Sequence, residues 1–289
     1  MLVAKAPADR AIWLENPYQP LMARIVRIVR MVDDNHLFTM RFVDEANART
    51  WQHRPGQFVM MSIPGAGEAP ISISSSPTRP GVLEFCVRRV GRVTDALYRL
   101  KANDLVGIRG PYGNGFPVEH MHGNDLLLVA GGLGMAPLRS LLWYALDNRD
   151  RFTNVTLMYG TRTPDVMLFR DELVTLVNRD DMKCLLTVDS DPAGKWQNHF
   201  GVLTSLFDHV EICAATTHAA VCGPPVVYKF ALEKLLALNF SKDRIHMSLE
   251  RRMKCGVGKC GHCSVGYKYT CVNGPIFTYW DALNLPEMI

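Results

Sequence analysis

A change of hydrophobic pattern near residue 120 limits what this chain can fold into. Before it, short runs alternate apolar and polar residues with a period of two, and turn pairs such as Pro55-Gly56 and Pro64-Gly65 separate them. This pattern is typical of an antiparallel β-barrel or sandwich. We expect one helix within it, capped by Thr94. The predicted strands cover residues 23–32, 37–43, 57–63, 71–75, 82–89 and 105–110.

Beyond residue 120, apolar strands alternate with amphipathic segments of helical length. The predicted strands are 125–130, 155–159, 183–188 and 219–222, and the predicted helices are 138–148, 169–177, 202–207 and 226–238. Alternation of this kind predicts βαβ units and a parallel sheet. A length of 289 residues suits more than one domain. We therefore predict a β-barrel domain over 20–120, an α/β domain over 121–245 and a tail over 246–289 that forms a loop around a metal centre.

Composition excludes several classes of protein. Apolar residues make up 48% and charged residues 21%, as in ordinary globular proteins, so disorder is excluded. A net charge of +4 without a long basic run gives no sign of nucleic-acid binding. The longest apolar run, residues 126–138, ends at Arg139 and is too short to span a membrane. The start Met1-Leu2-Val3-Ala4-Lys5 lacks the features of a signal peptide, so we expect a cytoplasmic protein.

Four cysteines gather in the last tenth of the chain with the spacing C-x4-C-x2-C-x7-C. This resembles the plant-type [2Fe-2S] spacing, and three interleaved glycines suit a backbone that wraps closely around sulfide. A structural zinc knuckle and a disulfide are the alternatives. His262 is expected beside the centre or facing solvent rather than as a ligand. The candidate ligands are Cys255, Cys260, Cys263 and Cys271, and the cysteines predicted to be mainly buried thiols are Cys86, Cys184, Cys213 and Cys222.

Three loops of the α/β half are candidates for binding a dinucleotide, because each follows a predicted parallel strand. At the carboxyl ends of such strands, open α/β sheets bind ligands. The first loop leads into a helix, where glycine amides can approach a pyrophosphate, although a tight turn is the alternative reading. The loops contain Gly131, Gly132, Gly134, Met135, Ala136 and Pro137 in the first, Thr161 and Arg162 in the second, and Gly223, Pro224 and Pro225 in the third.

Taken in order, these motifs resemble the ferredoxin-NADP⁺ reductase superfamily. They are Gly91-Arg92-Val93-Thr94, Gly110-Pro111-Tyr112-Gly113, the loop 131–137 and Cys222-Gly223-Pro224-Pro225. With the cysteine tail, the chain resembles a narrower group. That group comprises the gamma (diaphorase) subunits of soluble NiFe hydrogenase or sulfhydrogenase, the B subunit of anaerobic sulfite reductase and the electron-transfer subunit of dihydroorotate dehydrogenase.

The resemblance implies FAD in the β domain, NAD(P)H in the α/β domain and a [2Fe-2S] cluster in the tail. In the flavin motif, Ala69 replaces the family's arginine and Ile71 replaces its tyrosine, which weakens that part of the site. Ile71 is alternatively a plain core residue, and Arg88 and Arg92 are alternatively surface charges. The residues implied for flavin are Pro70, Ile71, Ser72, Val87, Arg88, Gly91, Arg92, Val93 and Thr94.

A flavin connects hydride chemistry to one-electron chemistry, so the three sites together predict an NAD(P)H-dependent electron-transfer subunit. Cys222 is expected to shape the nicotinamide pocket, and Arg162 could face a 2′-phosphate. A basic rim around the cysteines is expected to attract an acidic, ferredoxin-like subunit of a hydrogenase or sulfite reductase complex. The alternatives are a flavin-free nucleotide sensor with structural zinc and a self-sufficient reductase of a small acceptor. The predicted rim contains Arg251, Arg252, Lys254, Lys259 and Lys268 against Glu250.

Overall fold

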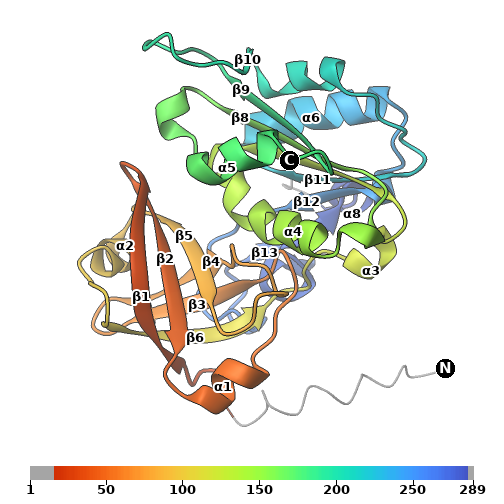
Figure 1. Cartoon of the computed structure of the whole chain (residues 1–289). Coiled ribbons are helices and arrows are strands. Elements are labelled where there is room, and N and C mark those ends of the chain that lie inside the picture. The colour runs from red at the N-terminus through yellow and green to blue at the C-terminus, as the bar shows by residue number, and fades with distance from the viewer. Residues whose placement is uncertain (1–15, 286–289) are drawn as a thin grey trace, which may run out of the picture.

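The computed structural model describes residues 16–285 and shows a β-barrel below an α/β domain, with the tail between them (Figure 1). The start of the chain, on which the expectation about a signal peptide depends, lies outside the described residues. So do the last four residues of the predicted tail.

Six antiparallel strands form the first domain in the order β4-β3-β6-β1-β2-β5. Its core includes Ile25, Phe38 and Phe85, all fully buried. The strands are β1 (Leu21–Val32), β2 (Asn35–Phe42), β3 (Phe58–Ile63), β4 (Gly67–Ser72), β5 (Leu83–Arg88) and β6 (Leu105–Tyr112), and the helices are α1 (Glu45–Thr50) and α2 (Arg92–Leu97).

Three elements of this domain differ from the sequence prediction. Only one helix was expected, and α1 is an additional one. β4 begins four residues before the predicted strand, because a tight turn after Ile63 places Gly67 directly opposite it on β3. α2 begins at Arg92, so Thr94 is not its cap. The Thr94 hydroxyl instead accepts hydrogen bonds from the amides of Val90 and Gly91, at 3.0 and 3.1 Å.

The second domain contains a sheet in the order β10-β9-β8-β7-β11-β12-β15, parallel except for β15. Alternate residues of β7 enter two cores, one beneath α4 and α5 and one beneath α6. Its strands are β7 (Asp125–Gly131), β8 (Val155–Thr161), β9 (Lys183–Val188), β10 (His199–Phe200), β11 (Thr217–Cys222), β12 (Ile245–Ser248) and β15 (Ile276–Thr278). Its main helices are α4 (Met135–Asp147), α5 (Arg170–Val177) and α6 (Pro225–Ala237), with the short α3 (Val118–Met121) leading in.

The tail has more regular structure than the predicted loop. It supplies β15 and all of β12 except Ile245, and β12 pairs with β11, so the sheet continues across the predicted boundary at residue 245. The other tail elements are β13 (Ser264–Val265), β14 (Lys268–Tyr269), α7 (Thr270–Asn273) and α8 (Tyr279–Leu283).

In the second domain, the helix predicted over residues 202–207 is a 3-10 helix, η5 (Leu203–His209).

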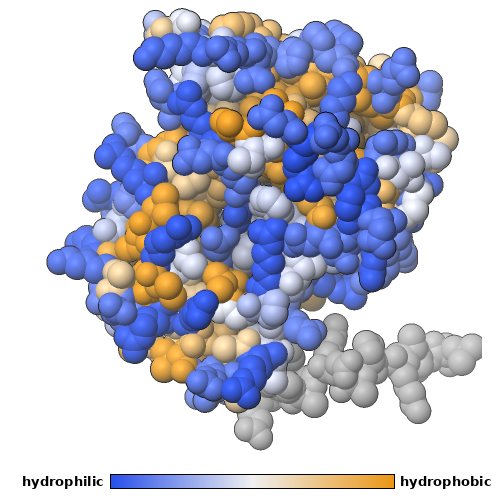
Figure 2. Space-filling model, in the orientation of Figure 1, coloured by the Kyte–Doolittle hydropathy of each residue, from blue (hydrophilic) through white to orange (hydrophobic). Residues whose placement is uncertain are grey.

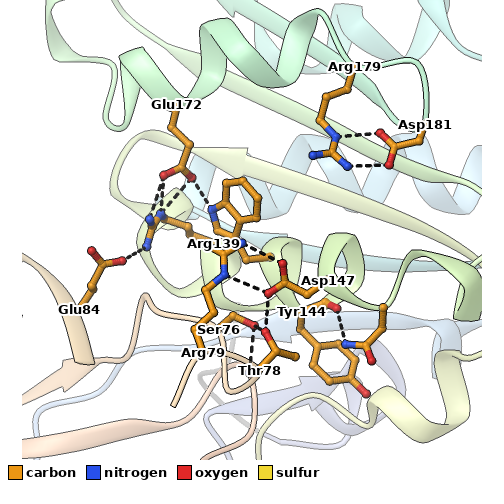
Figure 3. Close-up of polar contacts among 12 residues, drawn as sticks. Ser76, Thr78, Arg79, Glu84, Arg139, Tyr144, Asp147, Glu172, Arg179 and Asp181 are labelled. Carbon is orange, nitrogen blue, oxygen red and sulfur yellow. Dashed lines mark hydrogen bonds and ion pairs between the residues drawn. The ribbon is translucent and has the colours of Figure 1, made fainter. Parts of the chain in front are cut away.

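A buried arginine joins the two domains (Figure 3). Arg139 on α4 is 7% exposed in its side chain and pairs with Glu172 of α5 and with Glu84 of β5, both at 2.8 Å. It also donates to the carbonyl of Ser74, at 3.0 Å. Burial is tolerated because the guanidinium donors meet two carboxylates and a carbonyl.

A second contact between the domains lies beside the first. Arg79 of the barrel pairs with Asp147 at the end of α4 at 2.8 Å and stacks on Trp143, 4.1 Å from the ring centroid. The Arg79 side chain is 46% exposed, so this contact is weaker than the buried one.

Apolar side chains on the face drawn in Figure 2 occur in separate groups among polar ones. Several large ones are exposed, including Val26, Phe200 and Trp280. Among residues 16–285, no helix is long and apolar enough to cross a membrane.

We predict that Arg139→Ala destabilises the protein by about 3–5 kcal/mol, because Glu84 and Glu172 lose the cation that compensates their burial. Urea unfolding measures the effect. Arg179→Ala is the control, since its pair with Asp181 is about one-third exposed and contributes no more than about 1 kcal/mol. Equal losses in the two variants would contradict the role of Arg139.

Candidate flavin, nucleotide and iron-sulfur sites

A cavity of about 930 Å³ opens between the barrel, the start of α4 and the residues that follow β12. All nine residues expected to hold flavin line it, and Ala136 and Pro137 line it from the glycine loop. The nine come from β4, β5 and the segment that enters α2: Pro70, Ile71, Ser72, Val87, Arg88, Gly91, Arg92, Val93 and Thr94.

The departures from the family's flavin motif lie on β4. Ile71 is half-buried, lines the cavity and also packs against the barrel core. Its side chain therefore fits both readings made from the sequence. Ala69 is also in the lining, with Arg88 and Arg92 as cations on the same wall. These two arginines can supply the positive charge that an arginine at position 69 would have given.

The glycine loop of the α/β domain needs glycine because the end of β11 lies against it. A Cβ on Gly134 would come within 2.1 Å of the Cys222 carbonyl oxygen, and one on Gly131 within 2.5 Å of the Val227 side chain. Two of the three loops singled out in the sequence are therefore in direct contact, with Met135 as the first residue of α4.

The remaining nucleotide candidates also follow strand ends of this sheet. Thr161 ends β8 next to β7, and Arg162 follows it as an exposed residue. Gly223 and Pro224 connect β11 to α6, whose first residue is Pro225. Ten of the residues predicted to bind the nucleotide do not line the flavin cavity: Gly131, Gly132, Gly134, Met135, Thr161, Arg162, Cys222, Gly223, Pro224 and Pro225.

Cys222 is buried just behind this cavity. Its thiol donates to the carbonyl of Ser248, a cavity residue, over 3.7 Å. Burial raises the pKa of Cys222 to about 12, and the carboxylate of Glu250 adds to the effect. The group is therefore a neutral thiol at physiological pH, so its role is in shape and hydrogen bonding rather than nucleophilic attack.

One wall of the cavity was not predicted from the sequence. Ser248 ends β12, and it lines the cavity together with the residues that follow it, Leu249 through Lys254, and with Leu133, Glu68 and Pro275. β12 (Ile245–Ser248) has only four residues, two of them polar, so it carries no apolar run that identifies a strand. Assigning the whole tail to a metal loop hid its role as a parallel strand.

The cysteine loop is held against the barrel with its sulfurs facing backbone amides. The amides of Val257, Lys259 and Cys260 lie 3.3 to 3.4 Å from the Cys255 sulfur. The amide nitrogen of Gly258 lies 3.2 Å from the sulfur of Cys271. Amides directed at sulfur stabilise thiolates, so the donor set fits an iron-sulfur group.

The four sulfurs fall into two pairs. Those of Cys263 and Cys271 are 3.2 Å apart, and the Cys260 thiol is hydrogen-bonded to Cys255. No disulfide joins any of the eight cysteines, all of which lie within the described residues. Cys86 and Cys222 are buried as predicted, whereas Cys184 is only partly buried and Cys213 is exposed, contrary to the prediction. Within residues 16–285, no three His, Cys, Asp or Glu side chains converge as they would around one metal ion. The backbone amide of His262 lowers the pKa of Cys260 to about 7, and the His262 ring is exposed at the cavity.

The expected basic rim is smaller in the structure than in the sequence. Lys268 is bound to Asp281 at 2.7 Å with only a quarter of its side chain exposed. Arg251, Arg252 and Lys254 line the flavin cavity. Lys259 remains exposed on the cysteine loop. The expected rim therefore loses Lys268 to an ion pair, whereas its other four cations are exposed.

Three domain families match the chain in the order the fold shows. Residues 23–116 match the oxidoreductase FAD-binding domain, and residues 128–233 the oxidoreductase NAD-binding domain. Residues 250–282 match the iron-sulfur cluster binding domain of dihydroorotate dehydrogenase B.

Whole-chain relatives agree with these domains. The chain is 44% identical to the sulfhydrogenase 2 gamma subunit of Pyrococcus furiosus, covering 95% of this chain and 100% of that protein. Identity to the sulfhydrogenase 1 gamma subunit of the same organism is 43%, over 95% and 96% of the two chains. A probable dihydroorotate dehydrogenase B electron-transfer subunit from Pyrococcus furiosus is 33% identical, over 80% and 81%.

Among solved structures, an NADH-dependent reduced ferredoxin-NADP oxidoreductase superposes with a TM-score of 0.70. It is 26% identical, and the match covers 89% of this chain and 88% of that one. The chain therefore belongs to the family of sulfhydrogenase gamma subunits and dihydroorotate dehydrogenase B electron-transfer subunits, NAD(P)H-dependent flavin and iron-sulfur oxidoreductases with the ferredoxin reductase fold.

Proposed function

We propose that this chain relays electrons between NAD(P)(H) and the catalytic subunit of a soluble NiFe hydrogenase or sulfur reductase, using FAD and a [2Fe-2S] cluster. The supporting observation is one cavity whose walls are the flavin motif, the carboxyl end of the parallel sheet and the base of the cysteine loop. Identity to two sulfhydrogenase gamma subunits supports the partner.

The residues present suit each step of this relay. Arg92 and the amides entering α2 would bind the flavin pyrophosphate, and Arg88 would lie along the adenine-linked part of FAD. Ser72 would offer its hydroxyl and backbone to the flavin. A flavin accepts a hydride and releases electrons singly. The glycine loop and the turn after Cys222 would place nicotinamide against it, since hydride transfer depends mainly on positioning.

The paired cysteines support a [2Fe-2S] cluster. Each iron of such a cluster completes its tetrahedral coordination with two thiolates, and the four sulfurs form two pairs. A single zinc ion would instead gather all four around one point. None of the eight cysteines forms a disulfide, which agrees with a reducing, cytoplasmic compartment.

Purification from the native source tests the whole proposal. Flavin absorbance near 450 nm, equal amounts of iron and acid-labile sulfide, and a co-purifying hydrogenase subunit are expected. A colourless zinc protein would favour the flavin-free nucleotide sensor. A co-purifying sulfite reductase subunit would favour the B subunit of anaerobic sulfite reductase. Turnover of a small acceptor by the isolated chain would favour the self-sufficient reductase. Any of these three results overturns the proposal.

We predict that Cys255→Ser, Cys260→Ser, Cys263→Ser and Cys271→Ser each abolish or distort the EPR signal of the reduced cluster, because each removes one thiolate ligand. Cys213→Ser is the matched control, since this thiol is free and exposed outside the tail. Unchanged spectra in all four tail variants would refute the ligand assignment.

Arg162→Ala is expected to raise the KM for NADPH about tenfold or more and to leave the KM for NADH nearly unchanged. Arg162 follows β8, the second strand of the α/β domain, and an arginine there can form a bidentate contact with a 2′-phosphate. Steady-state kinetics with both nucleotides measure the effect, with NADH as internal control. A similar rise for both would assign the side chain to a shared part of the two nucleotides.

Lys259→Glu is expected to preserve NAD(P)H-to-dye activity and to slow electron delivery to the partner subunit, because this exposed lysine lies among the cluster ligands. Stopped-flow transfer to the purified partner at low salt measures the effect. Lys101→Glu is the control, since Lys101 is also exposed but precedes β6 at the end away from Tyr112 and the cysteine loop. Equal effects of both substitutions would reject docking at the loop.

A further inference from the structure

A single buried arginine connects β4, a strand that lines the flavin cavity, to the cysteine loop. Arg109 of β6 has a side chain only 2% exposed and forms a bidentate pair with Glu68 of β4, at 2.8 and 2.6 Å. The same guanidinium donates to the carbonyl oxygen of Cys255 at 3.2 and 3.3 Å. Glu68 lines the flavin cavity, and Cys255 is the first candidate ligand of the cluster.

Packing around this contact leaves the loop little room to shift. A Cβ on Gly256, whose φ is +75°, would approach Met60 to 2.9 Å and the Tyr112 ring to 3.1 Å. The remaining Arg109 bonds go to the Tyr112 hydroxyl at 3.0 Å and the Pro17 carbonyl at 2.9 Å. The loop therefore lies directly on β3 and β6, with Arg109 fixing the peptide of its first cysteine.

The order of charges along this contact has an electrostatic consequence. The guanidinium bonds to both neighbours, so the cation lies between the Glu68 carboxylate and the Cys255 peptide. A cluster held by four thiolates gains a further negative charge on reduction. A nearby buried cation stabilises that reduced form, and a carboxylate behind it offsets part of the effect.

We propose that Arg109 is a positioning residue for the iron-sulfur centre and that the Arg109–Glu68 pair sets the reduction potential of the cluster. Arg109 acts through the Cys255 peptide and touches no reacting atom. The inference rests on the proposed function, because it requires the cluster that function assigns to the tail.

The test is an EPR-monitored redox titration of the full chain. Glu68→Gln keeps the shape of the side chain but removes its charge, so the cluster potential shifts to a more positive value. Arg109→Gln leaves the carboxylate uncompensated, so the potential shifts to a more negative value and a chelator removes iron faster. Glu84→Gln is the matched control: it breaks the Arg139 pair, another buried ion pair of the barrel, and leaves the cluster potential unchanged.

The outcomes separate this inference from the proposed function. A wild-type chain without a [2Fe-2S] signal would reject the cluster itself. A wild-type signal with the same potential and iron-release rate in both variants would reject the role of the pair. If Arg109→Gln does not fold, Arg109→Lys retains the charge but loses the bidentate contact. It is expected to keep the potential and to release iron faster, and unchanged release would overturn the positioning role.

Discussion

The buried position of Arg139 between Glu84 and Glu172 determines how the two domains meet. The three groups come from α4, β5 and α5, so a single ion network connects the barrel to the α/β domain. Residues of both domains and of the tail line the flavin cavity, so its geometry depends on this contact. Because truncating one partner leaves a buried charge uncompensated, the domains are expected to keep one relative position.

The sequence predicted the domain classes because their patterns are local. Period-two runs gave the barrel, and alternating strands and helices gave the parallel sheet. All nine flavin candidates line a single cavity. Their direct contact with flavin stays a prediction, as do the nucleotide contacts of Arg162 and the loops at the strand ends.

Long-range pairings were not predictable in the same way. Arg139 only marked the end of an apolar run in the sequence, whereas its partners lie 55 and 33 residues away along the chain. Arg109 gave no signal, although it binds a loop that begins 146 residues later. β12 was missed because four residues beside a cysteine motif show no clear period, and only pairing with β11 identifies them as a strand.

The ends of the large sheet limit how another subunit can bind. At one end β10 has two residues, and at the other β15 has three that pair with β12. Such short edges offer few free backbone groups for strand addition, the mode by which many proteins extend a sheet across an interface. A subunit that binds at either end of this sheet must therefore be recognised through side chains rather than through an added strand.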